Sequence, residues 1–347
     1  MDLWGFDDGY FNNKTYRGNG DFSIRPTRAK VGGAGSYGMG GKVLDIGTYR
    51  TKSPHANLGK VTVSVGMDLQ DYDTTDFPDY PLSPINRVMV HHILRTLGAK
   101  KNPSIATGLP VEVFYSGKNF SVNEELIDQK KRNLATPVFL GDDIEGESPI
   151  ITFDSQIVLP EAFAGYYDFV LKEVDGGIEE IPERMEMSNF FVDFGGRTTD
   201  AALIDEATIV REQGGRKVSG SLPVGMINYR DKVLQSVGET FGIDQDDLSI
   251  KAVDNLLKGT FTHKGEKHDI SELLNAAKTD VATVILNDVR KRIKDGVGVD
   301  NMIFIGGGAS FFKDEILSYY PQAIFPENGI ISNARGMYKY LMYSKMD

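Results

Sequence analysis

Two short segments of the chain combine a carboxylate, a glycine turn and hydrogen-bond donors, a combination that suits phosphate and metal chemistry. The clearer one spans residues 190–204, where Asp193 ends an apolar, aromatic stretch. A charge there is costly unless a cation or hydrogen-bond donors meet it. Gly195 and Gly196 let a ligand approach the backbone closely, and the Thr198 hydroxyl and nearby N–H groups would face an anion. A phosphate with a divalent metal ion satisfies all of these groups together.

The chain begins with a similar arrangement. Asp8 and Gly9 follow a short apolar run, and Asn12 and Lys14 supply donors beyond the turn. Taken alone, the segment at 190–204 is explained about equally well as an ordinary hairpin with a tight turn, and for the N-terminal segment the hairpin is the better explanation. Two such hairpins, with carboxylates in equivalent places, could clamp a polyphosphate from both sides.

Two further segments offer candidate residues. Pro160 suits the first turn of a helix, so we predict a helix that begins there, with Glu161 placed where the helix dipole favours a carboxylate. Capping alone would explain that glutamate. Residues 302–305 form an apolar run that leads into Gly306–Gly308 and then a helix, a geometry that lets a flat or anionic ligand lie against the backbone.

Composition excludes several classes of protein. A chain of 347 residues suggests about two domains at roughly 150 residues each. The absence of cysteine excludes disulfides, zinc–thiolate sites and cysteine nucleophiles. No apolar run approaches the ~18 residues of a membrane span and the start has no signal-peptide pattern, so we expect a cytoplasmic protein with no membrane contact. A net charge of −11 argues against broad nucleic-acid binding, so any DNA would be reached through a partner.

Hydrophobic periodicity places these motifs on a mixture of strands and helices. The glycine-rich residues 17–60 are interpreted as short strands with long turns or a surface loop, and residues 173–188 as a loop that crosses between domains. His91 and His92 lack a third ligand nearby and are expected to pack rather than bind metal. Helices are predicted at residues 87–97, 226–237, 244–258, 270–293 and 312–319.

Together and in this order, the segments resemble the actin, Hsp70 and sugar-kinase ATPase superfamily. Asp8-Gly9-x-x-Asn12-x-Lys14 is similar to its first phosphate motif, Asp193-x-Gly195-Gly196-x-Thr198-Thr199-Asp200 to its second, and Ile305-Gly306-Gly307-Gly308-Ala309 to its adenosine motif. Within the superfamily the chain looks like the plasmid-segregation actins of the ParM (StbA) family over nearly its whole length. It departs from that family in residues 17–60, in the acidic loop at 68–80, and at Arg197, where a smaller or hydroxyl residue is frequent.

The resemblance implies an α/β actin-like fold of two related RNase H-like domains around a nucleotide cleft. The first would comprise residues 1–185 plus 333–347, and the second residues 186–332. It further implies a filament-forming ATPase that segregates plasmid DNA through a ParR-type adaptor, reaches centromere DNA only indirectly, and loses its filaments on ATP hydrolysis. The alternative is a small-molecule, sugar-type kinase of the same superfamily, but the sequence shows no clear substrate-side base for it.

The family's chemistry assigns roles to particular residues. Glu161 would orient the attacking water, and Asp8 and Asp193 would hold Mg²⁺ through water. The other partner of these groups is ATP, with GTP as the alternative, and Lys14 would pair with its β- and γ-phosphates. The residues expected to contact the nucleotide are Asp8, Gly9, Tyr10, Phe11, Asn12, Lys14, Asp193, Gly195, Gly196, Arg197, Thr198, Gly306, Gly307 and Gly308.

Overall fold

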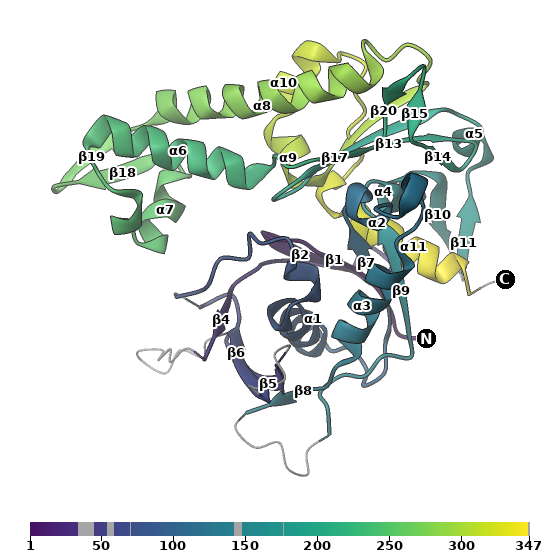
Figure 1. The fold of residues 1–347 in the computed structure, drawn as a ribbon, viewed down its shortest axis with the longest axis horizontal. Coiled ribbons are helices and arrows are strands. Elements are labelled where there is room, and N and C mark those ends of the chain that lie inside the picture. The colour runs from purple at the N-terminus through teal and green to yellow at the C-terminus, as the bar shows by residue number, and fades with distance from the viewer. Residues whose placement is uncertain (34–44, 54–58, 70, 142–147, 176, 346–347) are drawn as a thin grey trace.

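The computed structural model describes residues 1–33, 45–53, 59–69, 71–141, 148–175 and 177–345 (Figure 1). Of residues 17–60, predicted to form short strands with long turns or a surface loop, the described parts hold the strands Phe22–Pro26, Ala29–Val31 and Gly47–Lys52. Most of the glycine-rich run at residues 32–41 lies outside the described ranges, so the prediction is not tested there. None of the helices in the described ranges is long and apolar enough to cross a membrane.

The first half of the chain is built on a five-stranded sheet with the order β3-β2-β1-β7-β9. The first three strands are antiparallel neighbours, whereas β7 and β9 run parallel to β1. The bounds are β1 Leu3–Asp8, β2 Asn12–Tyr16, β3 Phe22–Pro26, β7 Ser104–Leu109 and β9 Ser155–Pro160. The β1–β2 turn thus lies between two antiparallel strands, next to the carboxyl ends of parallel ones.

The second half repeats this plan. Its sheet has the order β14-β13-β12-β20, and β17 also pairs with β13. Antiparallel pairing joins β12, β13 and β14, and β20 runs parallel to β12. The bounds are β12 Asn189–Phe194, β13 Thr199–Asp205, β14 Thr208–Val210, β17 Gly220–Leu222 and β20 Asn301–Ile305.

Each sheet carries an additional layer. Beside the first lies a four-stranded sheet, covered by a helix whose start is capped by Ser83, which accepts from the Asn86 N–H at 3.1 Å. From the second, three helices and a hairpin project to one side (Figure 1). These elements are β4 Ala29–Val31, β5 Gly47–Lys52, β6 Lys60–Val65, β8 Val138–Leu140 and α1 Pro84–Thr96, then α6 Met226–Phe241, α7 Ile250–Leu256, β18 Thr260–His263, β19 Glu266–Asp269 and α8 Ser271–Ile293.

Shorter elements complete the described chain. They are α2 Val111–Phe114, α3 Glu124–Ala135, β10 Leu171–Val174, β11 Gly177–Glu180, α5 Pro182–Met185, β15 Glu212–Gln213, β16 Arg216–Lys217, α9 Gly306–Phe311 and α10 Lys313–Tyr319.

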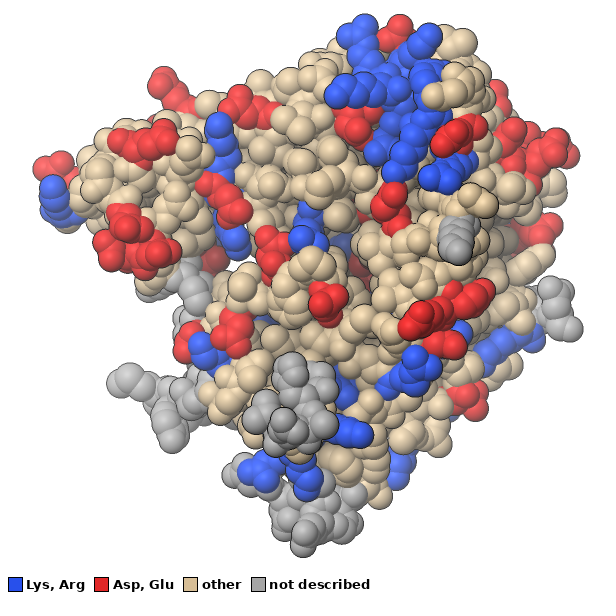
Figure 2. All heavy atoms as spheres, in the orientation of Figure 1, with Lys and Arg blue, Asp and Glu red and all other residues tan. Residues whose placement is uncertain are grey.

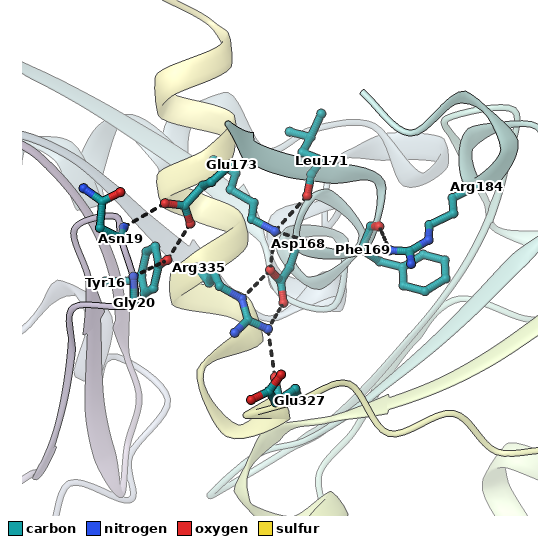
Figure 3. A network of polar contacts seen from close by, with 11 residues as sticks. Tyr16, Asn19, Gly20, Asp168, Phe169, Leu171, Glu173, Arg184, Glu327 and Arg335 are labelled. Atoms are coloured by element: carbon teal, nitrogen blue, oxygen red, sulfur yellow. Dashed lines mark hydrogen bonds and ion pairs between the residues drawn. The ribbon is translucent and has the colours of Figure 1, made fainter. Parts of the chain in front are cut away.

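The two halves are joined by α4 (Phe163–Val170) and α11 (Ser332–Tyr343), which lie between the sheets (Figure 1). The helices cross almost backbone to backbone, because a Cβ at Gly336 would lie 1.7 Å from the carbonyl oxygen of Ala164. Next to this contact, the buried Asp168 carboxylate accepts from Arg335 at 2.6 and 2.7 Å and from Lys339 at 2.9 Å (Figure 3). The crossing is therefore fixed by both steric fit and buried charge.

Most predicted elements are present with shifted ends. The helices expected at residues 87–97, 226–237 and 270–293 are α1, α6 and α8, and that expected at 312–319 is α10. The segment 244–258 holds one helical turn and the short α7, and the described part of 173–188 holds β10, β11 and α5 rather than a plain loop.

The helix start predicted at Pro160 is wrong, because the helix begins three residues later. Pro160 is the last residue of β9, and α4 begins at Phe163. The division into residues 1–185 plus 333–347 and 186–332 stays a prediction.

Acidic side chains are scattered over the face seen in Figure 2, and lysine and arginine gather mainly near β15 and β20. The net charge of −11 is therefore not evenly distributed over the surface.

Candidate functional site

The turns of the two repeated hairpins, β1–β2 and β12–β13, face each other across a cavity of about 60 Å³. Thirteen of the residues selected from the sequence line it: Gly9, Tyr10, Phe11, Asn12, Lys14, Glu161, Asp193, Gly195, Gly196, Arg197, Thr198, Gly307 and Gly308. The sequence reasoning missed four other lining residues, Asp7, Phe194, Met226 and Ile330. The fold therefore brings the four segments selected from the sequence to one place, together with Met226 and Ile330.

The cavity is small because the two turns touch. A Cβ at Gly196 would lie 2.8 Å from the Cβ of Phe11, so a side chain there would not fit. A volume of about 60 Å³ is far below the ~300–1,000 Å³ of typical ligand pockets. The halves must therefore move apart to admit a ligand larger than a few atoms.

The first hairpin presents Asp7, not Asp8, to the cavity. Successive residues of a strand point to opposite faces, and Asp8 shares the face of Trp4 and Phe6 in the core beside α1. Its carboxylate accepts from Lys130 at 2.8 and 2.9 Å and from Asn86 at 2.7 Å, fully inside the protein. The placement of Asp8 next to a bound nucleotide and metal, predicted from the sequence, is thus corrected.

Asp7 lies opposite Lys14 in the β1–β2 register and accepts its Nζ–H at 2.6 Å. Burial alone would lower the pKa of Lys14, but the carboxylates of Asp7 and Asp193 raise it above its usual value. Lys14 is therefore a fixed cation on the cavity wall.

Asp193 ends β12 with one oxygen bonded and the other unpaired. Its Oδ2 accepts from Asn333 of α11 at 2.6 Å, whereas its buried Oδ1 has no hydrogen-bond partner among the described residues. Gly306 has a φ of +85°, and a Cβ there would lie 2.2 Å from Oδ1. Gly306 does not line the cavity itself but makes room for this carboxylate, and Gly307 and Gly308 form the wall.

The second turn is held from two sides. The carbonyl oxygens of Gly195 and Gly196 accept from the first N–H groups of α6 at 3.2 and 2.8 Å. The buried Asp200 carboxylate accepts from Thr198 at 2.8 Å and from the Val111 N–H at 2.7 Å. Asp200 therefore shapes the turn from behind.

Glu161 lies between β9 and α4, where Ala162 takes the unusual φ of +62°. Because α4 begins only at Phe163, Glu161 is not a first-turn capping residue, and its side chain lines the cavity. Burial and the carboxylates of Asp200, Asp7 and Asp193 raise its pKa well above the usual value.

His91 and His92 serve packing, as the sequence indicated. His91 Nε2 lies 2.9 Å from the Leu134 carbonyl oxygen, and His92 Nδ1 lies 2.8 Å from the Tyr49 hydroxyl. Burial lowers the pKa of each to about 4, so both are neutral at physiological pH.

Several known proteins are similar to this chain. A family model described as "Archaeal actin homologue MreB-like, C-terminal" matches residues 191–318. In solved structures, pCBH ParM in a non-polymerisable quadruple mutant is similar with a TM-score of 0.74, at 18% identity over 100% of this chain and 99% of that one. The protein has an actin-like fold.

Two further structures support this assignment. The archaeal actin homologue Ta0583 in complex with ADP has a TM-score of 0.70 at 16% identity, covering 99% of this chain and 100% of that one. ParM from Clostridium botulinum, in a 15-stranded filament, has a TM-score of 0.68 at 18% identity, with 98% of each chain covered. No curated protein sequence matches the chain. At these identities the comparisons confirm the predicted resemblance to ParM-like actins at the level of the fold.

The cavity of this actin-like fold suits a hydrated divalent cation. Asp7, Glu161 and Asp193 line it, and burial together with the Asp7 carboxylate raises the pKa of both Glu161 and Asp193. Asp193 Oδ1 is a buried acceptor with no hydrogen-bond partner among the described residues. No group of three or more acidic, histidine or cysteine side chains in the described ranges is arranged to coordinate a metal ion directly. Mg²⁺, which keeps several of its waters, fits such a site through those waters.

Proposed function

We propose that the protein is a nucleotide-dependent, filament-forming ATPase that segregates plasmid DNA through a ParR-type adaptor. One observation carries the proposal above all: two hairpin turns related by the repeated sheet plan enclose a cavity with a fixed cation and three carboxylates. The likeness to ParM structures, one of them a filament, supports self-association. ATP is the favoured nucleotide, and GTP is the alternative.

Lys14 and Asp193 would handle the charges of the bound nucleotide. Lys14 would face the β- and γ-phosphates as a point charge, and the N–H groups around Gly9 and Gly196 would donate to phosphate oxygens. Asp7 and Asp193 would hold Mg²⁺ through water. The metal ion supplies neutralisation of the charge that develops on the phosphate oxygens.

Glu161 would position the attacking water. Burial and the neighbouring carboxylates raise its pKa, and a bound cation would offset their charge and favour the ionised carboxylate that accepts a hydrogen bond from water. Its fixed place between β9 and α4 matters more than basicity, because phosphoryl transfer depends mainly on positioning and charge stabilisation.

Light scattering and pelleting of the purified protein with Mg-ATP test the proposal, with phosphate release recorded in parallel. We expect scattering to rise after ATP addition and to decay as phosphate appears, and electron microscopy to show filaments. Addition of EDTA should abolish both signals. A protein that stays monomeric at high concentration with Mg-ATP would refute the filament.

Glu161→Ala separates hydrolysis from assembly. We expect this variant to bind nucleotide and polymerise but to release phosphate at least about a hundredfold more slowly, because a positioned acid or base typically accelerates a reaction by at least that factor. The slower hydrolysis should give longer-lived filaments. Glu186→Ala, an exposed glutamate outside the cavity, serves as the matched control. Unchanged phosphate release in Glu161→Ala would remove its assigned role.

A further inference from the structure

One ion pair crosses the mouth of the cavity between the two halves. Arg197, in the β12–β13 turn, donates its Nε–H to Asp76 at 2.6 Å. Asp76 belongs to the acidic segment between β6 and α1, one of the places where the sequence departs from its family. The adjacent Thr75 donates to the Tyr10 carbonyl oxygen at 2.6 Å. Asp76 is thus attached to the first hairpin, and Arg197 to the second.

Arg197 has hydrogen-bonding capacity that Asp76 does not use. Of the residues that line the cavity in the described part of the chain, only Lys14 and Arg197 are cationic, and Lys14 is already paired with Asp7. A guanidinium carries five N–H donors in a fixed plane. With Nε on Asp76 and the Tyr10 ring 5.6 Å from its Cζ, the group is oriented yet keeps donors for a second anion.

The neighbours of Arg197 link it to Glu161. Burial and the Glu161 carboxylate raise the pKa of the Tyr10 hydroxyl, and the positive charge of Arg197 partly lowers it again. Arg197, Tyr10 and Glu161 line the same cavity, and the Arg197 Cζ lies 5.6 Å from the Tyr10 ring. Glu161 is the residue proposed to orient the attacking water, so Arg197 shares the cavity in which the bond to the last phosphate would break.

We propose that Arg197 binds the terminal phosphate of a nucleoside triphosphate and that Asp76 is the residue that positions it. The inference rests on the proposed function and adds to it a sensor of nucleotide state. With a triphosphate bound, the guanidinium of Arg197 in the second half bridges Asp76 of the first half and the terminal phosphate. With a diphosphate only Asp76 remains, so the same contact distinguishes the two nucleotides.

Affinities for Mg-ATP and Mg-ADP, measured by calorimetry on dilute full-length protein, test this inference. Arg197→Ala should weaken Mg-ATP binding about tenfold, as expected for a hydrogen bond to a charged group, and change Mg-ADP binding less than twofold. Asp76→Asn should shift the ratio of the two affinities in the same direction, and Asp76→Glu should largely restore it. In a double-mutant cycle, Arg197→Ala with Asp76→Asn should be no worse than Arg197→Ala alone, because the two act as a unit.

Asp79→Asn is the matched control, since Asp79 is an exposed carboxylate of the same segment and does not line the cavity. This variant should bind both nucleotides like the wild type. Equal losses of ATP and ADP affinity in Arg197→Ala would overturn the terminal-phosphate contact. A wild-type affinity ratio in Asp76→Asn would overturn the positioning role. A wild-type protein that binds neither nucleotide would refute the proposed function itself, and the inference with it.

Discussion

Removal of the charge from Asp8 should lower the stability of the protein, whereas removal of the charge from the adjacent Asp7 should mainly weaken Mg-ATP binding. Asp8 and Lys130 form an ion pair whose side chains are only 2% and 1% exposed. Asp8→Asn would leave the Lys130 ammonium buried without a counter-charge, which typically costs about 3–5 kcal/mol. That is a large part of the ~5–15 kcal/mol that stabilises most proteins. Asp7→Asn removes a charge that raises the pKa values of Glu161 and Asp193, so relief of repulsion should offset part of the lost bond to Lys14.

Urea denaturation and Mg-ATP calorimetry on both variants distinguish the two roles. We expect Asp8→Asn to unfold at clearly lower urea, and Asp7→Asn to keep near wild-type stability but to lose about tenfold or more in Mg-ATP affinity. The double variant Asp8→Asn/Lys130→Met should recover most of the lost stability, since it no longer buries an unpaired charge. An Asp8→Asn protein with wild-type stability and abolished Mg-ATP binding would refute the assignment drawn from strand alternation.

Three further predictions concern the cavity and the helix crossing. Burial raises the pKa of Asp193 from 3.8 to about 7. Between these two pH values the native protein keeps the Asp193 proton, whereas the unfolded chain has released it. The contribution of Asp193 to the free energy of unfolding therefore falls as the pH rises from about 4 to 7 and then levels off. Urea midpoints of metal-free and nucleotide-free protein at pH 5, 6, 7 and 8 should show that decline, and a slope in Asp193→Asn equal to that of the wild type would contradict it. Gly336→Ala should prevent native packing, because its Cβ would lie 1.7 Å from the Ala164 carbonyl oxygen; soluble yield and melting temperature measure this, with Ala334→Gly on the same helix as a milder comparison. Arg335→Met should cost about 1.5–3 kcal/mol in urea denaturation, because it removes hydrogen bonds to the charged Asp168 while Lys339 stays paired with it. A loss well below about 1 kcal/mol would show that Lys339 alone suffices.

The fold and most of the cavity were predictable because each hairpin carries its own local signals. Glycine turns, a carboxylate at a strand end and apolar runs identified β1–β2 and β12–β13, and a long apolar stripe identified α8. The order of the two hairpins and the other motifs resembles the actin superfamily, and that resemblance implied two similar halves. These features depend on neighbouring residues in the chain, which is why the sequence alone could reveal them.

The errors arose where the answer depends on contacts between distant residues. The sequence motif assigns Asp8 to the nucleotide site, although alternation along β1 places Asp8 on the same face as Trp4 and Phe6. The alternation is visible in the sequence. The ion pair of Asp8 with Lys130, which lies on α3, could not be predicted from it. Asn333, which holds Asp193, carries no local motif and is brought there by α11. Pro160 favoured a helix start by propensity, but pairing of β9 with β7 continued the strand through it.

The contacts between the two halves differ in strength in a way that favours opening at the cavity mouth. At α4 and α11 the halves are joined by backbone contact and by the buried Asp168 network, which cannot rearrange without large cost. The Arg197–Asp76 pair at the cavity mouth and the Arg28–Asp254 pair elsewhere between the halves are partly exposed, and each is worth about 0–1 kcal/mol. A rotation that separates the two hairpin turns would break such weak ion pairs. The cavity of about 60 Å³ can therefore open to a nucleotide at small cost, and it can close again when the ligand supplies charges for Arg197 and Lys14 to bind.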